Sequence, residues 1–501
     1  MPQFSFVSRF AFLLLIATLT QGSRSTAAES PSQPNLVFIF ADDMGYGEIH
    51  ALNPERGKIP TPNLDKLVAQ GTIFSDAHTA SSVCTPSRYA LLTGRYCWRT
   101  KLQKGVVTGN DDPVIAADRT TVAEMLGKHG YDTAIIGKWH LNYNYEGEHK
   151  RAKTKVAKNA TRKPAPAPVG TRIVDGPITR GFNHYFGFHH AREMSSLCRG
   201  DRIIEEIDVV EMLPRLTSEA VRYVNEKADG AKSGKPFFLY LPLSSPHTPI
   251  VPSKEWIGKS GLGSYGDFVM QTDASAGAVI DAIDANGLTK NTLVIFSCDN
   301  GTSKAAGIKE LQAKGHYPSA HLRGSKADIW DGGHRVPFIT RWPAGGVKAG
   351  GTSDQLICLS DFFATTAELV GASVAENEAE DSYSFLAALS GQTVANPRRS
   401  VIHHSFSGHF AIRNERWKLV LANGSGGWSA PNEKAAAAMG APDVQLYDML
   451  TDPSEATNLY DHQASVKSEL MKLLEYDVKR GRSTPGPDQA NEREVNLWKS
   501  R

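Results

Sequence analysis

Four short runs of apolar residues along the chain each lead into a group of polar side chains. Their hydrophobicity is continuous rather than alternating, which is typical of strands buried on both faces of a parallel sheet. We therefore expect four buried strands whose carboxyl ends carry polar residues. The runs are Leu36–Phe40, Thr133–Ile136, Phe237–Leu241 and Leu293–Phe296.

Helical patterns lie between these runs. Thr121 and Glu124 form a capping box that opens a helix ending near Gly130. The segment Val269–Ile283 has amphipathic spacing and is closed by Asn286-Gly287. Strands that alternate with helices predict an α/β fold with a large mixed, mostly parallel sheet flanked by helices. In such folds, ligands bind at the carboxyl ends of the strands.

The pattern changes near residues 371–397, where Ala, Glu, Ser and a Gly-Gln-Thr stretch replace the alternation of strands and helices. Beyond it, short β-rich runs predict a small antiparallel sheet, and residues 465–476 predict a helix. We therefore divide the chain after residue 28 into a main domain, 29–375, and a smaller C-terminal subdomain, 376–501. The short runs are Val401–His404, Phe410–Arg413, Trp417–Leu421 and Gln445–Asp448.

The amino terminus predicts export. Arg9 precedes the apolar run Phe10–Leu19, and the small residues Ala27-Ala28 follow, so residues 1–28 have the pattern of a secretory signal peptide. No later segment is long and apolar enough to predict a membrane helix. We expect a periplasmic or secreted protein in a bacterium, and a lysosomal or extracellular one in a eukaryote.

The numbers of charged residues and of cysteines limit the kinds of partner and covalent cross-link to expect. Without residues 1–28, the 55 Lys and Arg fall to 53, equal to the 53 Asp and Glu, and a net charge near zero gives no indication of nucleic-acid binding. Residues 150–170 are locally basic and Pro-rich; we interpret them as a solvated insertion, with a polyanion-binding loop as the alternative. Five cysteines are too few for a disulfide scaffold. Cys298 follows an apolar run and is predicted to be a buried free thiol.

The stretch Cys84-Thr85-Pro86-Ser87-Arg88 is followed by an apolar run that ends at Gly94. Pro86 favours a first helical turn, and Gly94 is a plausible C-terminal stop. The free backbone N–H groups at such a helix start, with Arg88 one turn in, would suit an anion. A buried or disulfide-bonded cysteine beside a helix cap is the alternative interpretation.

Polar residues at the other strand ends supply the rest of a candidate site. Asp42, Asp43, Asp299 and Asn300 are oxygen ligands with no thiolate cluster or zinc-spaced histidine pair beside them, which favours Ca²⁺, or Mg²⁺ as the second choice. An Asp-Asp pair after a strand can also be a simple helix cap. Further cationic or proton-transferring groups follow at Lys138, His140, His247 and Lys326.

The stretch from Cys84 to Arg95 matches the signature C-x-P-S-R-x-x-x-L-T-G-R of the type I sulfatases at every fixed position. The resemblance extends over nearly all of the chain after residue 28. It includes the Asn35–Gly47 segment, Gly137–His140, Asp299-Asn300-Gly301 and Arg323–Lys326 in the family's order. The chain is thus identified as a member of this family, and residues 29–375 as its catalytic domain.

The resemblance implies a mechanism. Cys84 would be oxidised to formylglycine by a modifying enzyme, and its hydrate would attack sulfur, forming a sulfated enzyme intermediate. Asp42, Asp43, Asp299, Asn300 and converted Cys84 would hold one Ca²⁺. Arg88, Lys138 and Lys326 would stabilise charge on the transferring group, His247 or Lys326 would protonate the leaving alcohol, and His140 would deprotonate the second hydroxyl.

The sequence indicates substrate specificity less clearly than the chemistry, because the residues that determine specificity lie in loops. The resemblance favours a sulfated carbohydrate or aryl sulfate, with 6-O-sulfated galactose or N-acetylgalactosamine as one choice. The polar residues that could contact such a sugar, besides Lys138, His247 and Lys326, are His189, His190, Arg192, His316, His321 and Arg323.

Other functions stay open at this point. An enzyme that hydrolyses phosphonate monoesters or phosphodiesters would use the same nucleophile and metal. A non-catalytic sulfoglycan-binding protein would leave Cys84 as a thiol. A two-zinc enzyme is disfavoured, since additional His and Asp ligands are not evident. The sequence departs from the usual family pattern around Asp328, and the basic insertion obscures the alignment after His140.

Overall fold

The computed structural model describes residues 1–3, 33–109, 111–147 and 167–499. Most of the predicted signal peptide and most of the basic insertion lie outside these ranges. Residues 33–501 cluster as one unit, and the predicted division near residue 375 stays a prediction.

The main sheet has ten strands in the order β11-β2-β10-β9-β1-β8-β4-β5-β6-β7. The four predicted strands are its central neighbours, and all four run parallel: Ile39 of β1 (Asn35–Asp42) is paired with Phe296 of β9 and with Leu241 of β8. Strand β10 runs antiparallel to β9, and β6 runs antiparallel to both β5 and β7. The prediction of a mixed, mostly parallel sheet is therefore confirmed. The other bounds are β2 Thr72–Phe74, β4 Asp132–Lys138, β5 His184–Phe188, β6 Ser196–Arg199, β7 Arg202–Glu206, β8 Phe237–Pro246, β9 Thr292–Cys298, β10 Phe338–Arg341 and β11 Gly351–Ser353.

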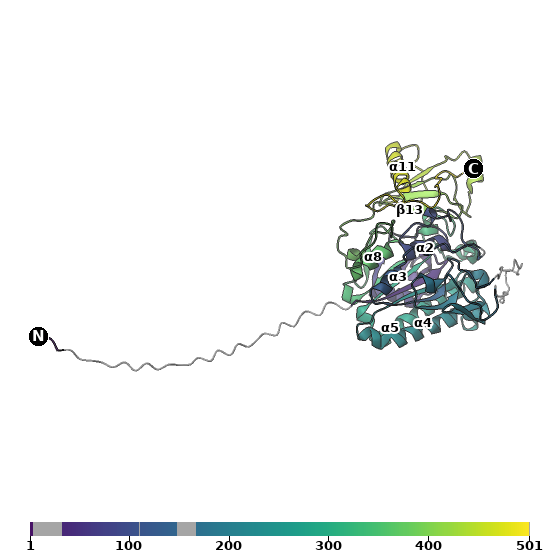
Figure 1. Cartoon of the computed structure of the whole chain (residues 1–501). Coiled ribbons are helices and arrows are strands. Elements are labelled where there is room, and N and C mark those ends of the chain that lie inside the picture. The colour runs from purple at the N-terminus through teal and green to yellow at the C-terminus, as the bar shows by residue number, and fades with distance from the viewer. Residues whose placement is uncertain (4–32, 110, 148–166, 500–501) are drawn as a thin grey trace. The chain divides into compact units, whose positions relative to one another are not determined.

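Helices cover both faces of this sheet (Figure 1). Alternate residues of β1 point to opposite faces: Phe38 packs with α2 (Cys84–Thr93), α3 (Val122–Lys128) and α8 (Asp361–Val370), and its ring centroid lies 4.9 Å from that of Phe362. Val37 and Ile39 pack with α1 (Pro62–Gln70), α4 (Val209–Lys232) and α5 (Gly263–Ala285) on the other face. Burial on both faces is why the strand runs are continuously apolar. Among the described residues, no helix has the length and apolar character needed to cross a membrane.

The C-terminal strands form a separate antiparallel sheet in the order β13-β14-β15-β16, as predicted. Its core includes Trp98, which follows α2, and the Trp98 ring packs edge-on against Phe410 at 5.3 Å. Helix α2 therefore lies between the two sheets. The bounds are β13 Val401–His404, β14 Phe410–Arg413, β15 Trp417–Val420, β16 Gln445–Asp448 and α11 Ala464–Lys479. Smaller elements are β3 Ala77–His78, β12 Ile357–Cys358, α6 Ile308–Ala313, α7 Asp331–His334, α9 Leu386–Leu389 and α10 Glu433–Ala438.

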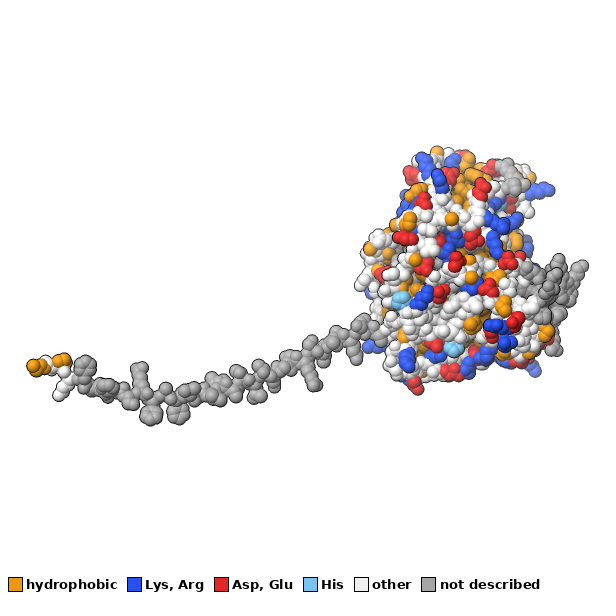
Figure 2. Space-filling view, viewed as in Figure 1, with side chains coloured by type: hydrophobic (Ala, Val, Ile, Leu, Met, Phe, Trp, Pro, Cys, Tyr) orange, Lys and Arg blue, Asp and Glu red, His pale blue; other side chains and the backbone are white. Residues whose placement is uncertain are grey.

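The described cysteines are all free and buried, which confirms the prediction for Cys298 and leaves no disulfide in this structure. On the face shown in Figure 2, acidic and basic side chains are interspersed. This mixed surface agrees with the near-zero net charge inferred for the chain after residue 28.

Candidate active site

The carboxyl ends of the four central strands bring the predicted polar residues together. Asp42 is the last residue of β1 and Lys138 the last of β4, and Asp299 directly follows β9. Backbone N–H of Asp43 donates to Asp299 Oδ1 at 3.1 Å, which joins the loops after β1 and β9. Parallel strands place these ends at one edge of the sheet, so residues more than 250 positions apart share one pocket.

Helix α2 delivers the signature residues to this edge. Val83 is extended, Cys84 is the first helical residue, and Gly94 ends the helix in the left-handed conformation with φ 64°. All ten residues of the helix are buried, so its polar side chains must find partners inside the protein. Arg88 does so: its Nε and Nη2 donate to Asp299 Oδ2 at 3.2 and 2.7 Å, and its Nη1 donates to Lys138 O at 3.2 Å.

Two lysines complete the ionic cluster. Lys138 Nζ donates to Asp42 Oδ2 at 2.6 Å. Lys326 Nζ donates to Asp43 Oδ1 and lies 3.3 Å from Cys84 Sγ. Three cationic and three acidic side chains, all of them buried, therefore cluster around the cysteine.

Burial and charge set the protonation of these groups. Burial favours the neutral acid at Asp42, but Lys138 and the other nearby cations outweigh it and hold the pKa of Asp42 well below its usual range. Burial and the neighbouring Asp42 raise the pKa of Asp299 to about 6. Burial also raises the pKa of the Cys84 thiol to about 12, in spite of the two lysines. An unmodified Cys84 is therefore a protonated thiol near neutral pH.

The donor set suits a hard cation. Asp42 Oδ1 and Asn300 Oδ1 are buried and have no hydrogen-bond partner among the described residues. Single ligand atoms of Asp42, Asp43, Cys84 and His247 all lie within 4.8 Å of one another. Orphaned buried oxygens are costly unless a further group satisfies them, and carboxylate and amide oxygens are the ligands Ca²⁺ prefers. The residues present thus fit a calcium ion.

Two histidines border this cluster. His247 follows β8, and its Nε2 lies 3.7 Å from Asp43 Oδ2; burial lowers its pKa to about 4, against the raising effect of Asp43 and Asp42. His140 Nε2 lies 3.2 Å from the carbonyl of Val107, which can only accept, so the proton sits on Nε2. Burial, with the charge on Lys138 next, holds the pKa of His140 well below its usual range. A neutral His140 therefore keeps a lone pair on Nδ1.

The predicted specificity residues other than His316 divide into three groups. His189 and His190 are buried, and the His190 ring centroid lies 5.6 Å from that of His140. His321 and Arg192 are exposed. Arg323 instead packs over the Trp330 ring at 3.7 Å and donates to Glu455 O at 2.7 Å.

His316, also considered from the sequence, is held inside the protein. Its Nδ1 accepts from the backbone N–H of Lys58 at 2.9 Å, and its Nε2 lies 3.0 Å from Glu48 Oε2. Both ring nitrogens are therefore engaged by the fold.

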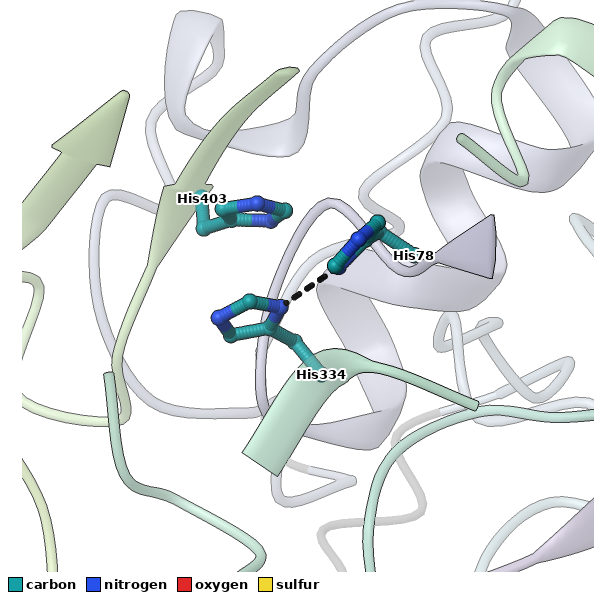
Figure 3. Close-up of side chains that lie close together, drawn as sticks. All are labelled: His78, His334 and His403. Atoms are coloured by element: carbon teal, nitrogen blue, oxygen red, sulfur yellow. Dashed lines mark hydrogen bonds between the residues drawn. The ribbon is translucent and has the colours of Figure 1, made fainter. Parts of the chain in front are cut away.

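A second histidine cluster, His78, His334 and His403, lies between β3, α7 and β13 (Figure 3). Its geometry is that of a packed junction. The Nδ1 atoms of His78 and His334 share a hydrogen bond at 3.1 Å, and the rings of His334 and His403 stack at 3.7 Å with 18° between their planes. Nearly parallel rings direct their in-plane lone pairs side by side, so those lone pairs do not converge on one ion. We therefore assign the cluster to packing between β3, α7 and β13.

A buried cluster of carboxylates, a cysteine at the start of a helix and three cationic side chains define an enzyme that acts on anionic esters. The family model described as Sulfatase matches residues 34–372, and the chain belongs to this family. The resemblance found in the sequence is confirmed, and the protein is a sulfuric ester hydrolase.

Relatives agree with this assignment. An N-acetylgalactosamine-6-O-sulfatase of Bacteroides thetaiotaomicron is 30% identical, with 94% of this chain and 98% of the relative covered. Human arylsulfatase A is 30% identical, covering 88% of this chain and 86% of its own.

Solved structures share the fold. One from Bacteroides thetaiotaomicron, described in work on the metabolism of multiple glycosaminoglycans, has a TM-score of 0.75 and 27% identity, covering 89% of this chain and 99% of that one. The structure of Ps i-CgsB in complex with a neocarrahexaose has a TM-score of 0.70 and 25% identity, with 92% and 96% covered.

Some neighbours of the site were not predicted. Glu193 lies 3.6 Å from His190 Nε2, and the His190–Glu193 spacing of three residues was the available signal. Thr302 Oγ1 accepts from the backbone N–H of Gly45, linking the loops after β1 and β9. No pattern in the sequence distinguishes that threonine from other loop threonines.

Proposed function

We propose that this sulfatase removes sulfate from sulfated glycans, 6-O-sulfated galactose or N-acetylgalactosamine among them, and also hydrolyses aryl sulfates. The named 6-O-sulfatase relative and the carbohydrate-bound Ps i-CgsB structure support a sulfated sugar as substrate. The observation that carries the proposal is the position of Cys84, whose Sγ lies 3.3 Å from Lys326 Nζ inside the acid cluster.

We infer that Cys84 is converted to formylglycine by a modifying enzyme of the host. As a thiol with a pKa of about 12, Cys84 would be almost wholly protonated near neutral pH, and the thiolate is the nucleophilic form of cysteine. The hydrated aldehyde would instead attack through a hydroxyl oxygen, which can lose its proton to a neighbouring base as the bond to sulfur forms. Conversion would therefore replace a buried protonated thiol with a nucleophile suited to general-base assistance.

The proposed metal is one Ca²⁺, held by Asp42, Asp43, Asp299 and Asn300 with converted Cys84. When bound, the cation would lower the cost of gathering negative charge, and the formylglycine would supply the nucleophile. The orphaned oxygens of Asp42 and Asn300 support this ligand set.

The remaining residues bind sulfate and move protons. Arg88, Lys138 and Lys326 already present their N–H groups to anionic oxygens, so they are oriented to hold sulfate oxygens as charge develops. The leaving alcohol takes its proton from Lys326, which stays cationic, or from His247, whose pKa the negative charge of bound sulfate would raise from about 4. His140 accepts a proton on Nδ1, whose lone pair is free because Val107 O fixes the tautomer.

Export completes the proposal. The predicted signal peptide would place the enzyme in the periplasm or outside the cell, where sulfated polysaccharides are accessible.

The test combines mass spectrometry with two assays on one preparation. The mass of the tryptic peptide ending at Arg88 is measured, and the same protein is assayed on an aryl sulfate and an aryl phosphate. We expect the aldehyde mass and sulfate release that disappears in Cys84→Ala. Full conversion with phosphate release and no sulfate release would instead support the phosphonate monoester or phosphodiester hydrolase. An unmodified thiol in protein made together with a modifying enzyme would favour the non-catalytic sulfoglycan-binding protein.

A further inference from the structure

An exposed aromatic side chain lies beside the loop that carries Lys326. Trp428 is 37% exposed, although it sits in the loop between β15 and β16 of the small sheet. Its ring centroid lies 5.4 Å from that of Phe406, and Lys304 Nζ lies over its ring at 5.1 Å. An exposed tryptophan paired with a lysine is a surface that can hold a ligand with both apolar and anionic groups.

Three segments that are distant in sequence are held to this loop by hydrogen bonds, two of them between backbone groups. Lys326 N donates to Thr302 O at 3.0 Å, two residues before Lys304, and Phe406 N donates to Ala327 O at 3.0 Å. Trp428 N donates to Asp328 Oδ1 at 2.8 Å. All three segments are thus bonded to the loop whose Lys326 side chain reaches the catalytic cluster, with its Nζ 3.3 Å from Cys84 Sγ.

Asp328 fixes the position of Trp428. Besides Trp428 N, its carboxylate accepts from Ser429 N at 2.9 Å, from Ser429 Oγ, and from Ser325 N at 2.9 Å. Gly427 lies so close to the loop that a Cβ there would stand 2.2 Å from Ala327 O. The departure from the family's usual sequence around Asp328 thus coincides with a clamp that holds an exposed tryptophan in place.

We propose that Trp428 and Lys304 form a subsite for the sugar next to the one that loses its sulfate, and that this neighbouring sugar carries an anionic group. The proposal rests on the proposed function, because it assumes a glycan substrate. A pyranose ring would lie against the indole, and its sulfate or carboxylate would pair with the Lys304 ammonium. The indole of Trp428 is exposed and available for this contact, whereas the backbone of Trp428 is fixed by its hydrogen bond to Asp328.

Kinetics on substrates of different length test the subsite. Wild type, Trp428→Ala, Trp428→Phe and Lys304→Gln are compared on an aryl sulfate, a sulfated N-acetylgalactosamine and a sulfated galactosaminoglycan tetrasaccharide. We expect Trp428→Ala to raise KM for the tetrasaccharide about tenfold, with kcat retained and the two small substrates unaffected. Trp428→Phe should recover most of the loss, and Lys304→Gln should raise KM only where the neighbouring sugar is anionic.

The matched control is Tyr476→Ala. Tyr476 is also an exposed aromatic beside a cation, with Arg480 over its ring at 5.1 Å, but it lies on α11. It should leave every substrate unchanged. Equal KM values for wild type and Trp428→Ala on the tetrasaccharide would overturn the subsite, as would an equal loss on all three substrates.

Binding to an inactive protein separates this inference from the proposed activity. Titration calorimetry of the tetrasaccharide uses Cys84→Ser with and without Trp428→Ala, and melting temperatures confirm that both are folded. Tighter binding with Trp428 present supports the subsite even if the wild type releases no sulfate, a result that would contradict only the proposed activity. Affinity that is the same without Trp428, or an absence of binding, overturns the subsite.

Discussion

The ammonium of Lys138 lies 2.6 Å from Asp42 Oδ2. Lys138 is the last residue of β4 and Asp42 the last of β1, and β8 lies between these two strands in the sheet. The lysine side chain thus reaches across the end of an intervening strand to meet the carboxylate. Arg88 Nη2 approaches Asp42 Oδ1 from α2 at 3.5 Å. Asp42 therefore contacts both the lysine at the end of β4 and the arginine of the signature helix.

Lys138→Ala should lower kcat by about 100- to 1000-fold, because it removes a preorganised cationic donor from the site. The protein should still fold, since Arg88 remains beside Asp42. Steady-state kinetics and circular dichroism on protein with verified conversion of Cys84 check both points. The control is Lys227→Ala, which breaks the pair between Lys227 and Asp132 at the other end of β4 and should leave kcat unchanged. Wild-type turnover in Lys138→Ala would remove Lys138 from the mechanism.

His247→Ala should discriminate between leaving groups. If His247 protonates the leaving alcohol, its loss should be severe for a sugar sulfate and small for 4-nitrophenyl sulfate, whose leaving group is acidic enough to depart unprotonated. A series of aryl sulfates of graded leaving-group pKa gives the measurement. His462→Ala, at an exposed histidine in the turn before α11, is the control. An equal loss across the series would assign the proton to Lys326 instead.

Calcium should stabilise the folded protein. A ligand that binds only the native state at 100 times its Kd contributes about 2.7 kcal/mol, so chelation should lower Tm and added Ca²⁺ should restore it. Asp43→Asn should abolish this response. Asp284→Asn, at a carboxylate that pairs with Arg341 away from the site, should retain it. A Tm indifferent to both chelator and calcium in the wild type would argue against a resident calcium ion.

Asp477 should make the protein less stable as pH rises. Burial, with the nearby charge of Asp381 also contributing, raises the pKa of this α11 carboxyl to about 7, and its Oδ2 is buried with no hydrogen-bond partner among the described residues. Between about pH 4 and pH 7 the native state holds a proton that the unfolded state has released, so the free energy of unfolding falls as pH rises through this range.

Asp477→Asn mimics the protonated acid and removes that dependence. Compared with wild type, it should be close to neutral near pH 4 and stabilising at pH 8, by up to ~4 kcal/mol for a shift of about three pKa units. Urea unfolding at the two pH values measures the difference. Asp488→Asn, at an exposed carboxylate, should have little effect at either pH. A difference for Asp477→Asn that does not change with pH would refute the assignment.

Much of the fold followed from local pattern. The four central strands were predictable because strands buried on both faces are continuously apolar, as in Leu293–Phe296. The helix over Val269–Ile283 proved to be the interior of the longer α5, and residues 465–476 the interior of α11. Strands of two or three residues, such as β3 and β12, gave no signal, because their pairing depends on partners about 280 residues away.

The sequence by itself determined the chemistry: which residue types stand at the strand ends, that Cys84 opens a helix, and that oxygen ligands suit a hard cation. Tertiary structure alone decided which of these groups touch. It placed Arg323 over Trp330, buried His189 and His190, and brought Trp428 from the small sheet to the Lys326 loop. The physical reason is that residue type and periodicity are local properties, whereas contacts between loops depend on sheet order and on how the two sheets pack around α2.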